Sequence, residues 1–189
     1  KVMLTMQSDT SIRLVQIILE EFYRIQPEYS TGAVYGPDSA AAEAQAVLAI
    51  GDDALRISRE NTYPVHLDLG EAWMRQTGLP FVFSVCVVRE DFIQEQPEEA
   101  RRIREMLLAC WREGGTRMAE ICQTVSDRIP MEHAACTRYL HAIEHDLTPI
   151  KIKALETYFS YLIARKEVPA TALPVQIFSF FFLASHSLH

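Results

Sequence analysis

Hydrophobic and polar positions in the first half of the chain predict strands that alternate with helices. Apolar runs of strand length lie at residues 2–5, 46–50, 65–69 and 79–88. The run at residues 79–88 has no polar alternation, which is typical of a strand buried on both faces. Apolar residues at helical spacing predict helices over residues 10–25, 53–58 and 71–76. Residues 27–37, rich in Pro and Gly, predict a loop, and the whole pattern favours an α/β fold.

The second half of the chain has a mainly helical pattern. Its four predicted helices start near Pro97, Thr116, Met131 and Pro149. Pro97 is followed by two glutamates, which suit the first turn of a helix because the helix dipole is positive there. Two of these helices carry apolar stripes, at Ile103, Leu107 and Trp111 and at Ile152, Leu155 and Phe159. These helices need a sheet or other helices to cover their apolar faces.

The charge balance limits the kinds of partner. The net charge is −7, so no overall basic field attracts nucleic acid or an anionic membrane surface, and we expect neither as a partner. No apolar run reaches the length of about 20 residues that a membrane-spanning helix needs. An anionic substrate must therefore be held by local groups such as helix N-termini, backbone N–H groups or a few arginines.

The four cysteines lie at wide and irregular spacings, at Cys86, Cys110, Cys122 and Cys136. Three of them fall within apolar helical patterns. We therefore expect reduced, buried thiols in a cytoplasmic protein and not a disulfide framework.

The first candidate site is the polar turn at residues 8–11, between a predicted strand and a predicted helix. A helix N-terminus offers free N–H groups and a positive dipole end, so the hydroxyls of Ser8, Thr10 and Ser11 could complete a carboxylate site. The alternative is that these residues only cap the helix. Spacing alone leaves both readings open.

Two further candidate sites follow along the chain. Gly51, at the end of a predicted strand, lets the backbone approach a ligand closely, and Asp52 could orient a hydroxyl or a water molecule. Both residues could equally form a solvated acidic start of the next helix. The backbone at Val82 could form the edge of an aromatic pocket, whereas core packing is the better interpretation for the side chains of Phe81 and Phe83.

Metal and nucleophile motifs are weak in this sequence. His141 and His145 are at i, i+4 spacing and would share one face of a helix, but no closely spaced cysteine pair accompanies them, so we expect neither to bind a metal. The sequence has no Gly-rich phosphate loop and no nucleophile elbow. No residue is assigned as catalytic from these patterns.

The order of these segments resembles a known enzyme family. A strand ending in the acidic turn Gly51-Asp52-Asp53, a second run ending in Asp68-Leu69-Gly70, and the run TGLPFVF at residues 77–83 are similar to the chorismate dehydratase family of the futalosine route to menaquinone. The resemblance implies the fold of type II periplasmic binding proteins, with two lobes and a cleft. On that plan, residues 1–80 form the second lobe, and residues 81–189 return to a mainly helical first lobe. We expect this first lobe to be incomplete, because the N-terminal segment of the family is missing.

The resemblance also implies a reaction and a set of binding residues. The family eliminates water from chorismate and leaves 3-[(1-carboxyvinyl)oxy]benzoate, with no metal and no organic cofactor. The implied substrate-binding residues are Ser8, Thr10, Ser11, Gly51, Asp52 and Val82. A homodimer is compatible with the sequence.

Two other functions remain open at this point. The same fold serves as a solute-binding receptor for small carboxylates, and the chain could be a truncated module without catalytic activity. Because elimination needs groups from both walls of a cleft, we expect this chain to be inactive by itself, with its apolar helix stripes partly exposed.

Overall fold

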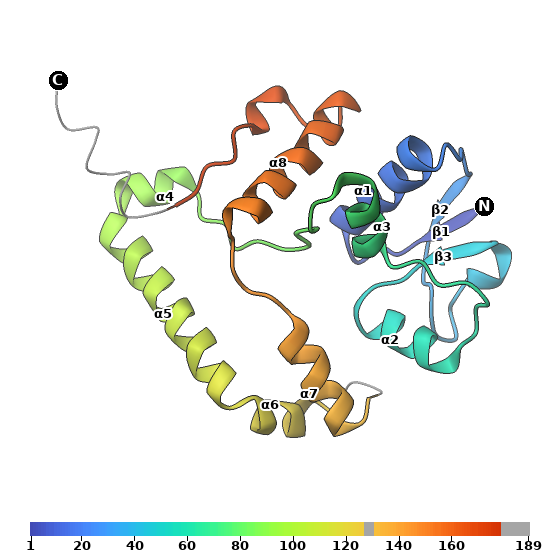
Figure 1. The fold of residues 1–189 in the computed structure, drawn as a ribbon, viewed down its shortest axis with the longest axis horizontal. Helices are drawn as coiled ribbons and strands as arrows, with labels where there is room; N and C mark the ends of the chain where they lie inside the picture. The colour runs from blue at the N-terminus through green and yellow to red at the C-terminus, as the bar shows by residue number, and fades with distance from the viewer. Residues whose placement is uncertain (127–130, 179–189) are drawn as a thin grey trace.

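The computed structural model describes residues 1–126 and 131–178 (Figure 1). It is of the predicted α/β type. Its strands are β1 (Val2–Leu4), β2 (Tyr29–Thr31) and β3 (Ala46–Leu48). Its α-helices are α1 (Asp9–Ile17), α2 (Gly51–Glu60), α3 (Leu69–Thr77), α4 (Glu90–Glu95), α5 (Pro97–Thr116), α6 (Met118–Val125), α7 (His133–Ala142) and α8 (Pro149–Ala164). Short π- and 3-10 turns lie at Ile18–Phe22, Ala41–Glu43 and Ala170–Ala172.

The three strands form a parallel sheet in the order β2-β1-β3. Met3 in the central strand pairs with Ser30 on one side and with Val47 on the other. All of β1 is buried, as a central strand between two covered faces should be. The predicted strands at residues 2–5 and 46–50 are confirmed, whereas β2 lies inside the segment predicted as a loop.

Two predicted strands are wrong. Residues 65–68 form an irregular connection with Val65 80% exposed, and Asp68 accepts the N–H of Glu71 to cap α3. Residues 79–88 form no strand either, and Val87 is 86% exposed. The segment is apolar enough for a buried strand, but the three-stranded sheet of the described residues does not include it, and an extended backbone without a paired neighbour is not a strand.

The main core lies between α1, α3 and α8. Trp73 at its centre is fully buried, and its ring lies 5.4 Å from Phe81, 5.7 Å from Tyr161 and 5.9 Å from Phe22. A smaller cluster joins the sheet to α1. Figure 1 shows α8 lying beside α1 and α3, although more than 70 residues of sequence separate α8 from α3. The C-terminal part of the chain therefore completes the core of the N-terminal part.

An ionic cluster also ties the C-terminal end of α8 to the π-helical turn Ile18–Phe22 that follows α1. Arg165 contacts Glu20 at 2.9 Å, Glu21 at 3.1 Å and Glu167 at 2.7 Å. Burial alone would lower the pKa of Arg165, but its hydrogen bonds to Glu167 and Glu20 raise that pKa above its usual value. The guanidinium group therefore stays charged and holds three carboxylates together.

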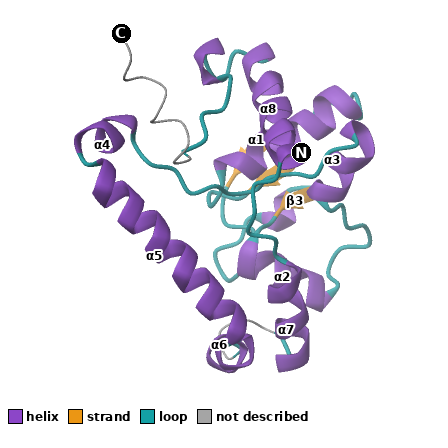
Figure 2. Cartoon of the chain, turned by 60° about the vertical axis from the view of Figure 1, so that its left-hand side comes forward, coloured by secondary structure: helices purple, strands orange, loops and turns teal. Residues whose placement is uncertain are grey.

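The helices α4 to α7 form an arm that extends away from the sheet (Figures 1 and 2). The expected exposure of its apolar stripe is confirmed, since Leu107 is 54% and Trp111 50% exposed. In α8, by contrast, Leu155 is buried. A second sheet is absent from the described residues, so the two-lobe arrangement and its boundary at residue 80 stay predictions. Among these same residues, no helix is both long and apolar enough to span a membrane.

Candidate functional site

The predicted motifs at residues 8–11 and 51–52 lie at one edge of the sheet. Strands β1 and β3 are parallel neighbours, and each leads from its carboxyl end into a helix, α1 and α2 respectively. The chain passes from β1 to β2 on one side and then crosses to β3 on the other. In parallel α/β sheets, ligands bind outside the carboxyl ends of the strands at such a change of direction. The two helix N-termini therefore meet where this fold class commonly binds small molecules.

The turn before α1 is organised by its own hydroxyl groups. Ser8 has extended backbone angles, and its Oγ accepts the backbone N–H of Ser11 at 3.1 Å. The same hydroxyl donates to Ser11 Oγ at 3.1 Å, and Ser11 is only 5% exposed. The capping interpretation therefore describes Ser8 and Ser11, whereas Thr10 is partly buried in the first turn of the helix. The hydroxyls of Ser8 and Ser11 shape the turn that presents the first N–H groups of α1.

The N-terminus of α2 has a different construction. Its N-cap residue, Ile50, makes no side-chain hydrogen bond to the first N–H groups of the helix. Gly51 has φ +55°, a left-handed conformation that L side chains rarely adopt. Gly51 and Asp52 are both exposed. This helix start is therefore open to a ligand from solvent.

A side-chain contact joins the two turns. Gln7, which precedes the cap of α1, donates from Nε2 to Asp53 Oδ2 at 3.2 Å. Asp53 in turn lies 3.7 Å from the guanidinium of Arg56. Two motifs more than 40 residues apart in sequence thus lie side by side, with a positive side chain one turn into α2.

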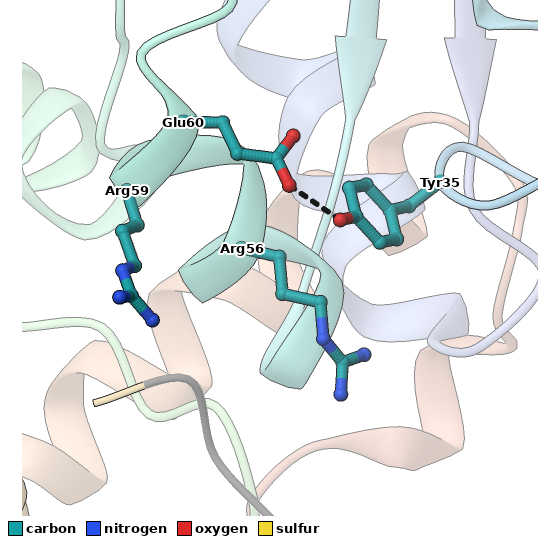
Figure 3. Close-up of a pocket in the computed structure, with 4 residues that line it drawn as sticks. All are labelled: Tyr35, Arg56, Arg59 and Glu60. Carbon is teal, nitrogen blue, oxygen red and sulfur yellow. Dashed lines mark hydrogen bonds between the residues drawn. The ribbon is translucent and has the colours of Figure 1, made fainter.

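A hollow of about 320 Å³ adjoins α2 (Figure 3). It is lined by Tyr35, Arg56, Arg59 and Glu60. In Figure 3 the Tyr35 hydroxyl points to the Glu60 carboxylate, and their hydrogen bond raises the pKa of Tyr35. The Arg56 guanidinium lies 5.9 Å from the centre of the Tyr35 ring. The volume is at the lower end of the range of small-molecule sites, about 300–1,000 Å³.

Sequence reasoning missed this hollow. Arg56 and Arg59 stand at i, i+3 spacing on the helix that follows Gly51, so they share one helix face. That spacing, taken together with the strand-to-helix turn, was the available signal. Tyr35 carried no such signal, because it comes from the loop after β2, a strand that the pattern did not predict.

The segment at Val82 connects to the same edge through Tyr158. The Phe81 ring lies 5.1 Å from Tyr158 and 4.7 Å from Phe83, and Val82 between the two phenylalanines is partly buried. The Tyr158 hydroxyl donates to the carbonyl oxygen of Thr10 at 3.2 Å. Burial, and secondarily the charge of Glu167, raises the pKa of Tyr158 to about 12, so the donor proton is retained. Core packing is confirmed for Phe81, whereas Phe83 is 53% exposed.

The histidines singled out from the sequence lie elsewhere. His141 is in the last turn of α7, but this helix ends at Ala142, so the expected shared helix face of His141 and His145 is wrong. The His145 ring lies 5.8 Å from that of Trp111. Within residues 1–126 and 131–178, no three His, Cys, Asp or Glu side chains are arranged to hold a metal ion.

Comparison with known protein families agrees with the resemblance seen in the sequence. The model of the family described as menaquinone biosynthesis matches residues 1–164. The match includes every strand and every α-helix of the structure, among them both turns at the sheet edge and the run TGLPFVF. The chain therefore belongs to the menaquinone biosynthesis family.

Proposed function

We propose that the protein is a chorismate dehydratase of the futalosine route to menaquinone. It would eliminate water from chorismate and release 3-[(1-carboxyvinyl)oxy]benzoate in the cytoplasm. Family membership supports the pathway. The observation that supports the substrate class is the pair of helix N-termini, α1 and α2, held side by side by the contact between Gln7 and Asp53.

The electrostatics of this edge favour a dicarboxylate. Each helix N-terminus carries about half a positive charge and several N–H donors without intrahelical partners. In a protein of net charge −7, such fixed dipoles hold an anion without the need for a large basic patch. Arg56, one turn into α2, pairs with Asp53 at 3.7 Å and offsets the negative charge of that carboxylate beside the helix N-terminus. We assign one carboxylate of chorismate to the N-terminus of α1 and the other to that of α2.

The binding residues then have distinct roles. Thr10 and the first N–H groups of α1 contact the ligand, while Ser8 and Ser11 hold the turn in shape. Gly51 gives the ligand access to the backbone of α2, and Asp52 orients a hydroxyl group of the substrate. Val82 forms the edge that faces the ring.

The main task of the protein in this reaction is to position the substrate. The elimination needs a base for one ring C–H group and a hydrogen-bond donor for the departing hydroxide. Formation of an aromatic ring supplies much of the driving force. Holding the two carboxylates so that the reacting atoms are aligned is therefore the main contribution of the site.

Titration calorimetry with chorismate, combined with chromatographic detection of the enolpyruvyl-benzoate product, tests the proposal. We expect Thr10→Ala to weaken binding by about 1–3 kcal/mol, the range for a hydrogen bond to a charged group. Thr124→Ala is the matched control, because in the described part of the chain its hydroxyl donates to Glu120 O within α6, so binding should not change. Binding without product would favour either a solute-binding receptor or the truncated module without catalytic activity, and equal affinity of the two variants would refute the assignment of Thr10.

A further inference from the structure

The helical arm has an unusual core. In the described residues between 101 and 153, the only buried side chains are those of Cys122 in α6 and Cys136 in α7, both with 0% exposure. The large apolar side chains of α5 are exposed instead, at Ile103, Met106, Leu107 and Trp111. The contact between α6 and α7 is therefore centred on two thiols.

The two helices are placed so that these thiols face each other. In Figure 2, α6 is seen almost end-on beside α7, and Figure 1 shows the same two helices side by side. Ala119 and His133 lie three residues before Cys122 and Cys136, respectively. The Nε2 atom of His133 lies 3.3 Å from the carbonyl oxygen of Ala119. Burial, followed by a hydrogen bond with the thiol of Cys122, raises the pKa of Cys136. The other two cysteines, Cys86 and Cys110, are exposed, contrary to the expectation of buried thiols.

We propose that Cys122 and Cys136 are a reversible disulfide site that locks α6 against α7. The thiols are free in this structure. The oxidant is a small-molecule disulfide such as oxidised glutathione. One protein thiolate attacks it, releases one glutathione thiol and forms a mixed disulfide; the second protein thiolate then displaces the other glutathione. Together the two protein thiols lose two protons and two electrons, and the oxidised glutathione takes up these protons and electrons to become two glutathione thiols.

The arm allows such a reaction although the thiols are buried. Buried cysteines are normally inert, because oxidants cannot reach them and because a raised pKa keeps them protonated. Segments with few buried apolar contacts, however, open locally at low cost in free energy. Opening of α6 from α7 exposes both thiols together, and reclosing brings the mixed disulfide next to the second thiol. The bond then opposes the same opening that allowed it to form.

The test uses the full chain in glutathione buffers of decreasing reducing power. Free thiols are alkylated under denaturing conditions, and the peptides are mapped by mass spectrometry. We expect a peptide pair joined through Cys122 and Cys136, lighter by two hydrogen atoms, while Cys86 and Cys110 carry glutathione. Hydrogen exchange at the amides of α6 and α7 should slow in the oxidised protein, with no change in α1.

Two variants make the result specific. Cys86→Ser/Cys110→Ser keeps the pair alone and should retain the disulfide. Adding Cys136→Ser should leave Cys122 with a mixed disulfide only. The proposal is overturned if Cys122 and Cys136 in the unmodified sequence remain thiols, or carry one glutathione each, in the buffer that converts Cys86 and Cys110. Mapping of the unmodified sequence decides this even where a variant folds poorly.

Discussion

Replacing Tyr158 with Phe tests the link between α8 and the candidate site. The change removes one hydroxyl, which donates to Thr10 O at 3.2 Å across 148 residues of sequence, and it keeps the buried ring. Because donor and acceptor are both neutral, we expect a loss of about 1 kcal/mol in the free energy of unfolding. With a urea m-value of about 2 kcal/mol/M, the unfolding midpoint should fall by about 0.5 M.

Urea unfolding followed by the fluorescence of buried Trp73 measures this loss, in a Trp111→Phe background that leaves one reporter. Tyr161→Phe is the matched control on the same helix. Its ring also contacts Trp73, but within the described residues its hydroxyl has no hydrogen-bond partner, so the midpoint should change little. If Tyr158→Phe and Tyr161→Phe shift the midpoint equally, the contact with Thr10 does not stabilise the fold.

The effect of Tyr158 also has a defined pH dependence. Its pKa is about 12 in the folded protein, against an ordinary value of 10.0, because burial disfavours the phenolate. A raised pKa means that the unfolded chain releases this proton first. The stability difference between the original protein and Tyr158→Phe should therefore be constant below about pH 10. Between about pH 10 and pH 12 it should fall and reverse in sign, because the rise in pKa from 10.0 to about 12 outweighs the hydrogen bond, which contributes about 1 kcal/mol. A difference that stays constant through that window would contradict the assigned environment.

Two further predictions concern the turn before α2 and the ionic cluster. Gly51→Ala should destabilise the protein by about 1 kcal/mol, because a Cβ has free space there but strains a φ of +55°. The control Gly115→Ala, inside α5, should instead be neutral or stabilising. Equal effects of the two variants in urea unfolding would refute the strain argument. Arg165→Gln should lower the free energy of unfolding by about 1–3 kcal/mol, because three carboxylates lose a shared, largely buried partner. Arg102→Gln, in the exposed pair with Glu99, should lower it by less than about 0.5 kcal/mol. The same unfolding assay compares the two arginine variants, and comparable losses would show that the cluster around Arg165 is only a surface feature.

Helices were largely predictable from the sequence because their signals are local. Pro97 begins α5 and Pro149 begins α8, as their sequence context predicted. Gly78 ends α3 in a left-handed conformation, which glycine adopts readily at helix C-termini. The helix predicted to start near Thr116 begins instead at Met118, because α5 continues through the pair Gly114-Gly115 to Thr116. Two glycines near a helix end cost only about 1 kcal/mol each relative to alanine, which one more turn of hydrogen bonds can offset.

The candidate site was predictable as a set of motifs but not as a site. Sequence placed hydroxyls at residues 8–11 and a glycine at residue 51, each next to a strand end. That the two turns adjoin depends on the parallel pairing of β1 with β3 and on the contact from Gln7 to Asp53. Neither is encoded by spacing along the chain, because strand order is a property of the assembled sheet. The roles of Ser8 and Ser11 were likewise decided only when their mutual hydrogen bonds were known.

The segment between α3 and α4 shows why a hydrophobic run does not by itself determine a strand. Phe81 is held because the rings of Trp73 and Tyr158 lie within 5.4 Å and 5.1 Å of it. Two residues later, Phe83 is 53% exposed, and Val87 is 86% exposed. Residues of high β propensity lie on both sides of this change from packed to exposed side chains, so β propensity cannot be its cause. An extended backbone becomes a strand only where a second strand offers hydrogen-bond partners, and the described sheet offers none there. Burial in this segment therefore follows the partner surfaces that the fold provides.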